Sequence, residues 1–434
     1  MYYDTGSEEG HSILDYLRFG RHGHGGGNHH HTQVSKKDAI AEYDASMRNI
    51  CETTNFGGCI VRSYLPTPNT INLAWEPKDN FPFSWAEDTP SLLKFVIGYP
   101  FADDAATTTT STTTTTTATT TAIGDEPNHN TENNSDRGSL ISEEMVHRLV
   151  ETANHHKGDV VGFFADLDYT AMEMEIDSNN NSNCNNRKGK SSTRDVQLQR
   201  LRSTLKAASA IDCPLQIRIA PGYKVCGERS EINSNANDNA LNHGYSLAIR
   251  DLGRVLLEAS VISSWKVHIS SWNGKAEHLV ALSGAFSSSS KMHQQNNDKN
   301  DNDTDTRQFK FQHELCFGFD GSLGFSKAVH LHESAFEVCP QNIVLETGGP
   351  GILPPIVARH CGRNAFCHSG QIPFVAEELA KHLSRNPRNT IFTQLMDGGD
   401  NDNGGERIAD EEEITAEKVA RWASTTTKTL YGLQ

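Results

Sequence analysis

The segment 342–355 joins a buried-strand pattern to a polar, glycine-rich exit. Residues 343–345, Ile-Val-Leu, form a short apolar run that is typical of a strand in a parallel sheet. Glu346 and Thr347 follow at the end of this run, and the turn 348–351 then leads the backbone away. Loops that leave the carboxyl ends of parallel strands carry the chemistry of α/β folds. We therefore expect a functional site here, with Glu346 as a candidate catalytic carboxylate.

Further polar side chains close other apolar runs, namely Asp168, Arg218 and His268. Carboxylates and imidazoles bind metal ions and transfer protons. A guanidinium can anchor a phosphate-bearing ligand without a metal. Structural roles are the alternative: His268 as a core histidine with its hydrogen bonds satisfied, and Asp168 and Glu346 as acceptors of backbone N–H groups where a strand turns into a loop.

The segment 342–355 resembles the signature Leu-Glu-Thr-Asp-x-Pro of the TatD family of metal-dependent nucleases, which are (β/α)8 barrels. Gly318 to Ala328 resembles the family's Gly-x-x-Gly-x-x-Thr-Phe strand and turn. Gln371 to Ala380 is similar to its Asn-x-Pro helix start, and Thr426 to Leu433 to its closing Asn-Ala-x-x-Leu-Phe-Gly-Leu. The similarity is most specific between Gln312 and Ala380.

The rest of the chain has the alternation of strands and helices that this fold requires. Apolar runs predict strands over residues 2–5, 59–61, 94–100, 159–169, 214–218, 265–268 and 344–347. Helical spacing of apolar residues predicts helices over residues 13–17, 35–54, 140–157, 196–210 and 247–259. We expect an α/β fold, a (β/α)8 TIM-type barrel with long low-complexity insertions, formed as a single domain by residues 1–434.

Six tracts contain few residues that could be buried: about 18–34, 103–138, 177–194, 228–242, 286–307 and 397–408. They are rich in Thr, Asn, Asp, Ser, Gly or His, and they fall between predicted elements, where a barrel tolerates insertions. The first contains His22, His24 and the run 29–31, which can hold a transition metal. Because a glycine-rich tract gives no fixed ligand geometry, we treat it as an adventitious metal tract.

Charge and cysteine content restrict the class of protein. A formal net charge of −16 excludes a general nucleic-acid coat but leaves room for nucleic acid at a local site in the barrel mouth. The 9 cysteines are irregularly spaced without a Cys-x-x-Cys pair, which favours reduced thiols in the cytoplasm or nucleus. The acidic start lacks an apolar signal segment, and no run is long enough to span a membrane.

The resemblance also implies where metal ligands should lie. Hydrolysis of a phosphodiester by this route uses two cations held by converging His, Asp and Glu side chains. At the corresponding positions the chain has Gly6, Glu8, Phe164, Arg218, His268 and Gly348. Only Glu8 and His268 can bind a metal, so these two are the candidate metal ligands, while Asp4 and Asp320 are further carboxylates that could face the mouth.

Two functions therefore compete. In the first, the chain is a metal-dependent hydrolase of ester bonds in nucleic acid, a deoxyribonuclease-type enzyme that uses Mg, Mn or Zn. Glu346 and Asp168 would then be catalytic, and Arg218 would bind substrate. In the second, the eroded ligand set leaves activity weak or absent and no metal is needed, so that the barrel serves as a binding or scaffold protein.

Overall fold

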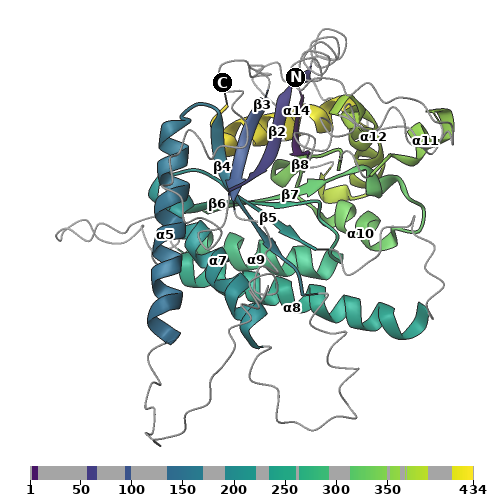
Figure 1. The fold of residues 1–434 in the computed structure, drawn as a ribbon. Coiled ribbons are helices and arrows are strands. Elements are labelled where there is room, and N and C mark those ends of the chain that lie inside the picture. The colour runs from purple at the N-terminus through teal and green to yellow at the C-terminus, as the bar shows by residue number, and fades with distance from the viewer. Residues whose placement is uncertain are drawn as a thin grey trace, which may run out of the picture.

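The computed structural model describes residues 2–7, 56–65, 93–98, 134–169, 191–220, 234–260, 263–292, 313–348, 352–361, 367, 369–389 and 413–433. Eight parallel strands follow one another across a single sheet in the order of the chain. They are β1 (Tyr2–Ser7), β2 (Phe56–Tyr64), β3 (Leu93–Gly98), β4 (Val160–Leu167), β5 (Leu215–Ile219), β6 (Trp265–Ser270), β7 (His313–Phe319) and β8 (Ile343–Leu345). Strands β1 and β8 also lie in contact, so the sheet curls back on itself and the expected (β/α)8 barrel is confirmed (Figure 1).

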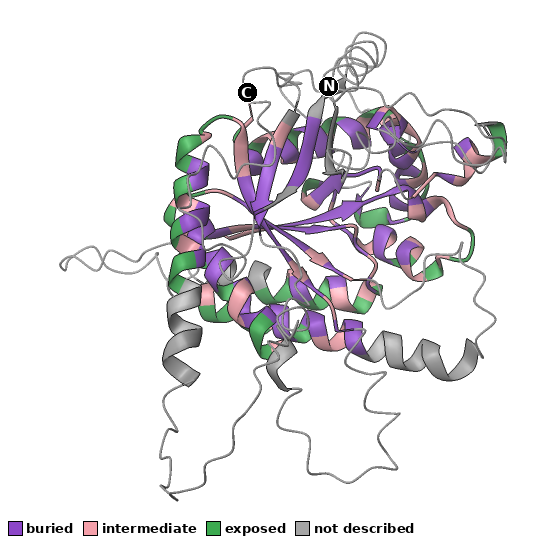
Figure 2. Ribbon diagram, in the orientation of Figure 1, coloured by how far each residue is buried: buried purple, intermediate pink, exposed green. Residues whose placement is uncertain are grey.

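Helices alternate with the strands and surround the barrel (Figure 1). They are α5 (Asn134–His155), α7 (Ser191–Ala210), α8 (Ser234–Ser260), α9 (Ala276–Met292), α10 (Val329–Glu337), α11 (Pro355–Cys361), α12 (Ile372–Leu383) and α14 (Ala416–Tyr431). Three short 3-10 helices, η4 (Gly321–Gly324), η5 (Pro340–Asn342) and η6 (Ser369–Gln371), lie in the connections. Where their burial is described, the helices have buried residues on the side of the strands and exposed residues on the outer side (Figure 2).

Each predicted strand overlaps an observed one, but several helices are longer than predicted. Helix α5 begins at Asn134, α7 at Ser191 and α8 at Ser234, all within tracts that were expected to be insertions. Helix α9, which was not predicted, also ends within such a tract, at Met292. The polar residues at these helix ends lack the periodic apolar residues from which a helix could be predicted. The helices predicted over 13–17 and 35–54 lie outside the described residues.

Two separate apolar clusters lie on the two faces of the sheet. The larger packs between strands and helices and includes Phe95, Ile217 and Phe317. The smaller fills the barrel interior and contains Ile60, Val96, Phe164, Cys316, Val344, Leu430 and Tyr431. Side chains alternate across a strand, so the even-numbered residues of β2 to β8 face the interior.

Helix α14 closes the barrel at the end where the strands begin. Its first turn is capped by Thr415, whose hydroxyl accepts the Lys418 N–H at 3.3 Å. Its last residue is followed by Gly432 in the left-handed conformation, with φ of 63°. Thr426 donates to the carbonyl of Gln341, just before β8, at 3.0 Å. The end of α14 therefore reaches the barrel floor, where Tyr431 enters the interior cluster.

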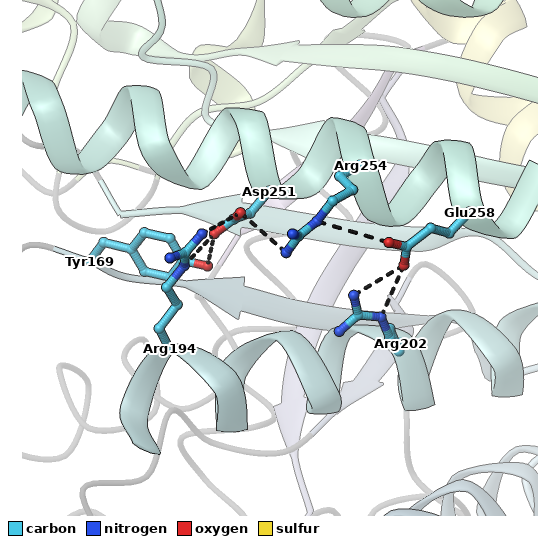
Figure 3. Close-up of polar contacts among 6 residues, drawn as sticks. All are labelled: Tyr169, Arg194, Arg202, Asp251, Arg254 and Glu258. Atoms are coloured by element: carbon cyan, nitrogen blue, oxygen red, sulfur yellow. Dashed lines mark hydrogen bonds and ion pairs between the residues drawn. The ribbon is translucent and has the colours of Figure 1, made fainter. Parts of the chain in front are cut away.

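An ion-pair ladder joins α7 to α8 on the outside of the barrel (Figure 3). Its members are Tyr169, Arg194, Arg202, Asp251, Arg254 and Glu258. Asp251, 3% exposed, accepts two hydrogen bonds of 2.7 Å from Arg194 and one of 2.9 Å from the Tyr169 hydroxyl. Burial would raise the pKa of Asp251, but Arg194 and Tyr169 together hold that pKa below its usual value. At the exposed end, Glu258 accepts from Arg202 at 3.0 Å.

The buried end of this ladder should carry most of its stabilisation. We expect Asp251→Asn to lower the free energy of unfolding by about 2–3 kcal/mol, because Arg194 loses the buried negative charge and one of the two acceptor oxygens that it faces. Glu258→Gln, at the solvent-exposed end, should change it by no more than about 0.5 kcal/mol. Denaturant unfolding of both variants checks this, and equal losses would contradict the assignment.

Candidate functional site

Several polar residues interrupt the apolar interior of the barrel. Arg62 lies on β2, Gln216 on β5, His268 and Ser270 on β6, and Glu346 directly after β8. All are buried, and all share the inward-facing parity. Together with Ser271 and Tyr431 they are joined by contacts that run across the barrel. We call these seven residues the interior network.

Glu346 lies at the centre of the interior network and is fully buried. Its Oε1 accepts the Ser270 hydroxyl at 2.7 Å, and its Oε2 accepts both the backbone N–H and the hydroxyl of Ser271, at 2.5 and 3.1 Å. His268 Nε2 stands 3.1 Å from Oε1. The carboxylate also needs Gly318 beneath it, because a Cβ there would lie 2.5 Å from Glu346 Cδ.

His268 connects Glu346 to the barrel floor. Its Nδ1 lies 2.8 Å from the Tyr431 hydroxyl and 3.5 Å from the Gln216 side-chain nitrogen, and both of these groups can donate. Its Nε2 faces the carboxylate, which can only accept, although the alignment falls outside hydrogen-bond geometry. A proton on Nε2 therefore faces the carboxylate, and neither ring nitrogen points into open space.

Arg62 supplies the interior network with a permanent positive charge. It is 6% exposed, its Nε donates to Gln216 Oε1 at 2.9 Å, and its Nη2 donates to the Ser270 hydroxyl. Because Ser270 in turn donates to Glu346, one hydroxyl links the guanidinium to the carboxylate.

These neighbours keep Glu346 ionised despite its burial. Burial by itself would raise the pKa of Glu346, but His268, Arg62 and the Ser270 hydrogen bond lower it below its usual value. A carboxyl whose folded-state pKa is depressed contributes stability that is present above its unfolded pKa and is lost as the pH falls through the folded value. The interior network should therefore weaken in acid.

A second carboxyl, Asp320, lies beside the interior network with the opposite pKa shift. It is 5% exposed and accepts the Ser322 N–H at 2.9 Å, which starts η4. Burial raises the pKa of Asp320 to about 6, and the negative charge of Glu346 adds to this, although hydrogen bonds from Ser322 and Ser271 oppose it. Environments of this kind, which push two nearby carboxyls apart in pKa, occur at acid–base sites.

Three of the positions at which the resemblance implies metal ligands have residues of another kind, namely Phe164, Gly348 and Arg218. Phe164 is 1% exposed and packs in the interior cluster. Gly348 has a φ of 68°, and a Cβ on it would lie 3.0 Å from Ile352 and 3.3 Å from Asp320 Oδ2. Arg218 donates to both carboxylate oxygens of Asp166, at 3.1 and 3.3 Å.

The structure brings together only some of the residues proposed from the sequence. Glu346 and His268 are in contact, and Arg218, partly exposed, is paired with Asp166, whose side chain is 5% exposed. Asp168 follows β4 and exchanges two backbone hydrogen bonds with the Gln197 side chain on α7, of 3.0 and 2.8 Å. Glu8 lies outside the described residues.

The described residues do not fit a two-metal cluster. Both oxygens of Glu346 already have two close partners each, which matches the acceptor capacity of a carboxylate. Both nitrogens of His268 are engaged, and Arg62 places a cation in the same space. Within the described ranges, no group of three or more His, Cys, Asp or Glu is arranged to hold a metal ion.

No protein-family model matches the chain, and no curated protein is significantly similar to it. Solved structures do resemble it. YjjV, a TatD homologue from Escherichia coli K12, is 12% identical with a TM-score of 0.48, over 100% of this chain and 98% of that one. A hydrolase TatD family protein from Entamoeba histolytica is 11% identical with a TM-score of 0.47, over 100% and 98% of the two chains. An uncharacterized amidohydrolase from Saccharomyces cerevisiae is 10% identical with a TM-score of 0.41, over 99% of both.

The resemblance to TatD proteins, expected from the sequence, is thus found among solved structures as well. At these TM-scores and identities it carries no argument about residues or activity, which must come from the site itself. Among the described helices, none is long and apolar enough to cross a membrane.

Several members of the interior network were missed from the sequence. Arg62 and Gln216 stand at inward positions of the apolar runs Cys-Ile-Val-Arg and Leu-Gln-Ile-Arg, so a charged or amide side chain between buried neighbours was the available signal. Tyr431 gave no such signal, because it reaches His268 only through the packing of α14, 163 residues further along the chain.

A double-mutant cycle tests the charge compensation inside the barrel. We expect Arg62→Met and Glu346→Gln each to lower the free energy of unfolding by about 3–5 kcal/mol, because each leaves the other charge buried without compensation. The double variant should lose no more than either single variant. Denaturant unfolding of the three variants checks this. If the loss of unfolding free energy in the double variant equals the sum of the two single losses, the two charges act independently.

The raised pKa of Asp320 predicts a specific pH dependence of stability. The folded protein binds the Asp320 proton more tightly than the unfolded chain, so this group should destabilise the fold by about 2–3 kcal/mol as the pH rises from about 4 to about 6. Asp320→Asn keeps an oxygen for the Ser322 N–H but cannot titrate. The stability of this variant relative to the natural chain should therefore increase across that window.

Unfolding measured at several pH values checks this, with the exposed Glu258→Gln as the control that should follow the natural profile. A constant offset between Asp320→Asn and the natural chain would mean that Asp320 is ionised throughout the window.

Proposed function

We propose that this chain is a TatD-like, hydrolase-type barrel whose interior is held by its own charges in place of metal ions. Hydrolysis of ester bonds is then weak or absent, and the barrel acts as a binding protein. The observation that carries this proposal is that Glu346 and His268 face each other and other protein groups at every polar atom of their side chains. A metal ligand needs a lone pair directed at the cation. The lone pairs of Glu346 face His268 Nε2 and the serine donors, and the lone pair of His268 Nδ1 faces Tyr431.

The packing around Phe164 and Gly348 supports an interior that is adapted to these residues and has no space for the metal ligands of the TatD pattern. A carboxylate at Phe164 would be placed among Ile60, Val96 and Val344, which offer no donor. An aspartate at Gly348 would need the left-handed backbone conformation, would press on Ile352, and would bring a negative charge to Asp320. Restoring ligands at these positions is therefore expected to destabilise the barrel before it restores metal binding.

A metal-dependent hydrolase of nucleic acid is the second candidate. The feature that favours it is the convergence of His268, Glu346 and Asp320 next to the carboxyl ends of β6 to β8, two of these groups being carboxyls of opposite pKa shift. In that case Glu8 and His268 would hold Mg, Mn or Zn, Glu346 and Asp168 would be catalytic, and Arg218 would bind a phosphate of nucleic acid at the mouth.

Metal dependence of stability and of activity separates the two candidates. A bound metal raises the unfolding temperature in proportion to its affinity for the folded state. We expect the natural chain to have the same unfolding temperature in the presence of Mg, Mn or Zn as in the presence of a chelator. Hydrolysis of single-stranded DNA should not exceed that of a His268→Ala preparation.

Two variants make the result decisive, because Glu8→Gln tests the candidate ligand outside the described residues and His268→Ala the one inside. Metal-dependent hydrolysis that disappears in both variants would overturn our proposal and establish the second candidate.

A further inference from the structure

A surface pocket lies between the start of α9, the outer face of α10 and the end of α12. Its volume is 560 Å3, within the range of small-molecule sites. The residues that line it are Ala276, Val329, His332, Glu333, Phe336, Glu337, His382 and Arg385. Five of them, at positions 329, 332, 333, 336 and 337, form one stripe along α10 with helical spacing. None belongs to the interior network.

Two stacked imidazoles give this pocket a planar wall. The rings of His332 and His382 lie 4.4 Å apart at an interplanar angle of 17°. His332 Nε2 stands 2.9 Å from the Leu323 carbonyl and donates to it, which fixes the orientation of that ring. Burial and the neighbouring His332 lower the pKa of His382 to about 4, so this ring is neutral at neutral pH. Phe336 and Val329, which is 56% exposed, add apolar surface.

Charged side chains of both signs surround this wall. Glu333 and Glu337 come from α10, and Arg385 follows the end of α12. In the described part of the chain, none of the three takes part in an ion pair, whereas Lys381 nearby on α12 pairs with Glu377 and Glu378 at 3.1 and 2.8 Å. The pocket thus presents carboxylates and a guanidinium that are available to a ligand, beside rings that can stack with one.

We infer that this pocket binds a free aromatic amino acid. The guanidinium of Arg385 is complementary to the ligand carboxylate, and the carboxylates of Glu333 and Glu337 to its ammonium group. The aromatic side chain of the ligand lies against the imidazole stack and Phe336, where offset or edge contacts between rings are favourable. An aromatic residue within the chain of a partner protein has the same ring but neither a free ammonium group nor a free carboxylate, so it would leave Arg385, Glu333 and Glu337 without these partners.

L-Tryptophan and three analogues separate these possibilities in titration calorimetry at neutral pH. Tryptamine lacks the carboxylate, indole-3-propionate lacks the ammonium group, and N-acetyl-L-tryptophanamide lacks both charges. We expect tryptophan to bind at one site, and each single-charge analogue to bind about tenfold more weakly, the factor that corresponds to about 1.4 kcal/mol. Absence of saturable tryptophan binding, or equal binding of N-acetyl-L-tryptophanamide, would overturn the inference.

Matched variants assign the charges to their partners. Arg385→Met should weaken tryptophan about tenfold and leave tryptamine unchanged, whereas Glu333→Gln combined with Glu337→Gln should weaken both and leave indole-3-propionate unchanged. Arg388→Met is the control, because Arg388 is also exposed, lies three residues further on, and does not line the pocket. Tryptophan binding that is the same in all these variants would place the ligand elsewhere and contradict the inference.

Discussion

An ionised carboxylate buried inside a barrel is the constraint on which this structure depends. Glu346 has no exposed surface, and a charge in that position is stable only if several groups compensate it. Arg62 provides the opposite charge, and Ser270 accepts a hydrogen bond from Arg62 and donates one to the carboxylate. His268 and Ser271 occupy the remaining acceptor positions of Glu346. Each of these groups comes from a different part of the chain from Glu346, so the charge can be accommodated only in the closed barrel.

Several local features of the backbone follow from that requirement. Gly318 on β7 has no side chain because the Glu346 carboxylate fills the space above it. Ser271 has a φ of 48°, a conformation that costs on the order of 1 kcal/mol for a residue with a side chain, and its N–H is thereby aimed at Glu346. Tyr431 brings the last helix into the interior and holds His268 from the opposite side. The carboxylate, the strand ends and α14 therefore support one another.

The sequence predicted the barrel well because strands and helices are encoded locally. Short apolar runs located seven of the eight strands, and the positions of Glu346 and His268 at the ends of two such runs made both candidates for one site. The partners of these residues could not be predicted in the same way. Arg62 and His268 are brought together through Gln216 and Ser270 by strand order and register, and Tyr431 by the packing of a helix end. Such contacts depend on the closed fold, and no local spacing encodes them.

Under our proposal, the interior network compensates the charge of Glu346 without a metal ion. The most direct test is the metal content of the purified chain after deletion of residues 21–31, which removes the adventitious histidines. Our account predicts well below one ion per chain after purification without chelators, with the fold intact by circular dichroism. One or two tightly held ions per chain, lost on His268→Ala, would contradict it.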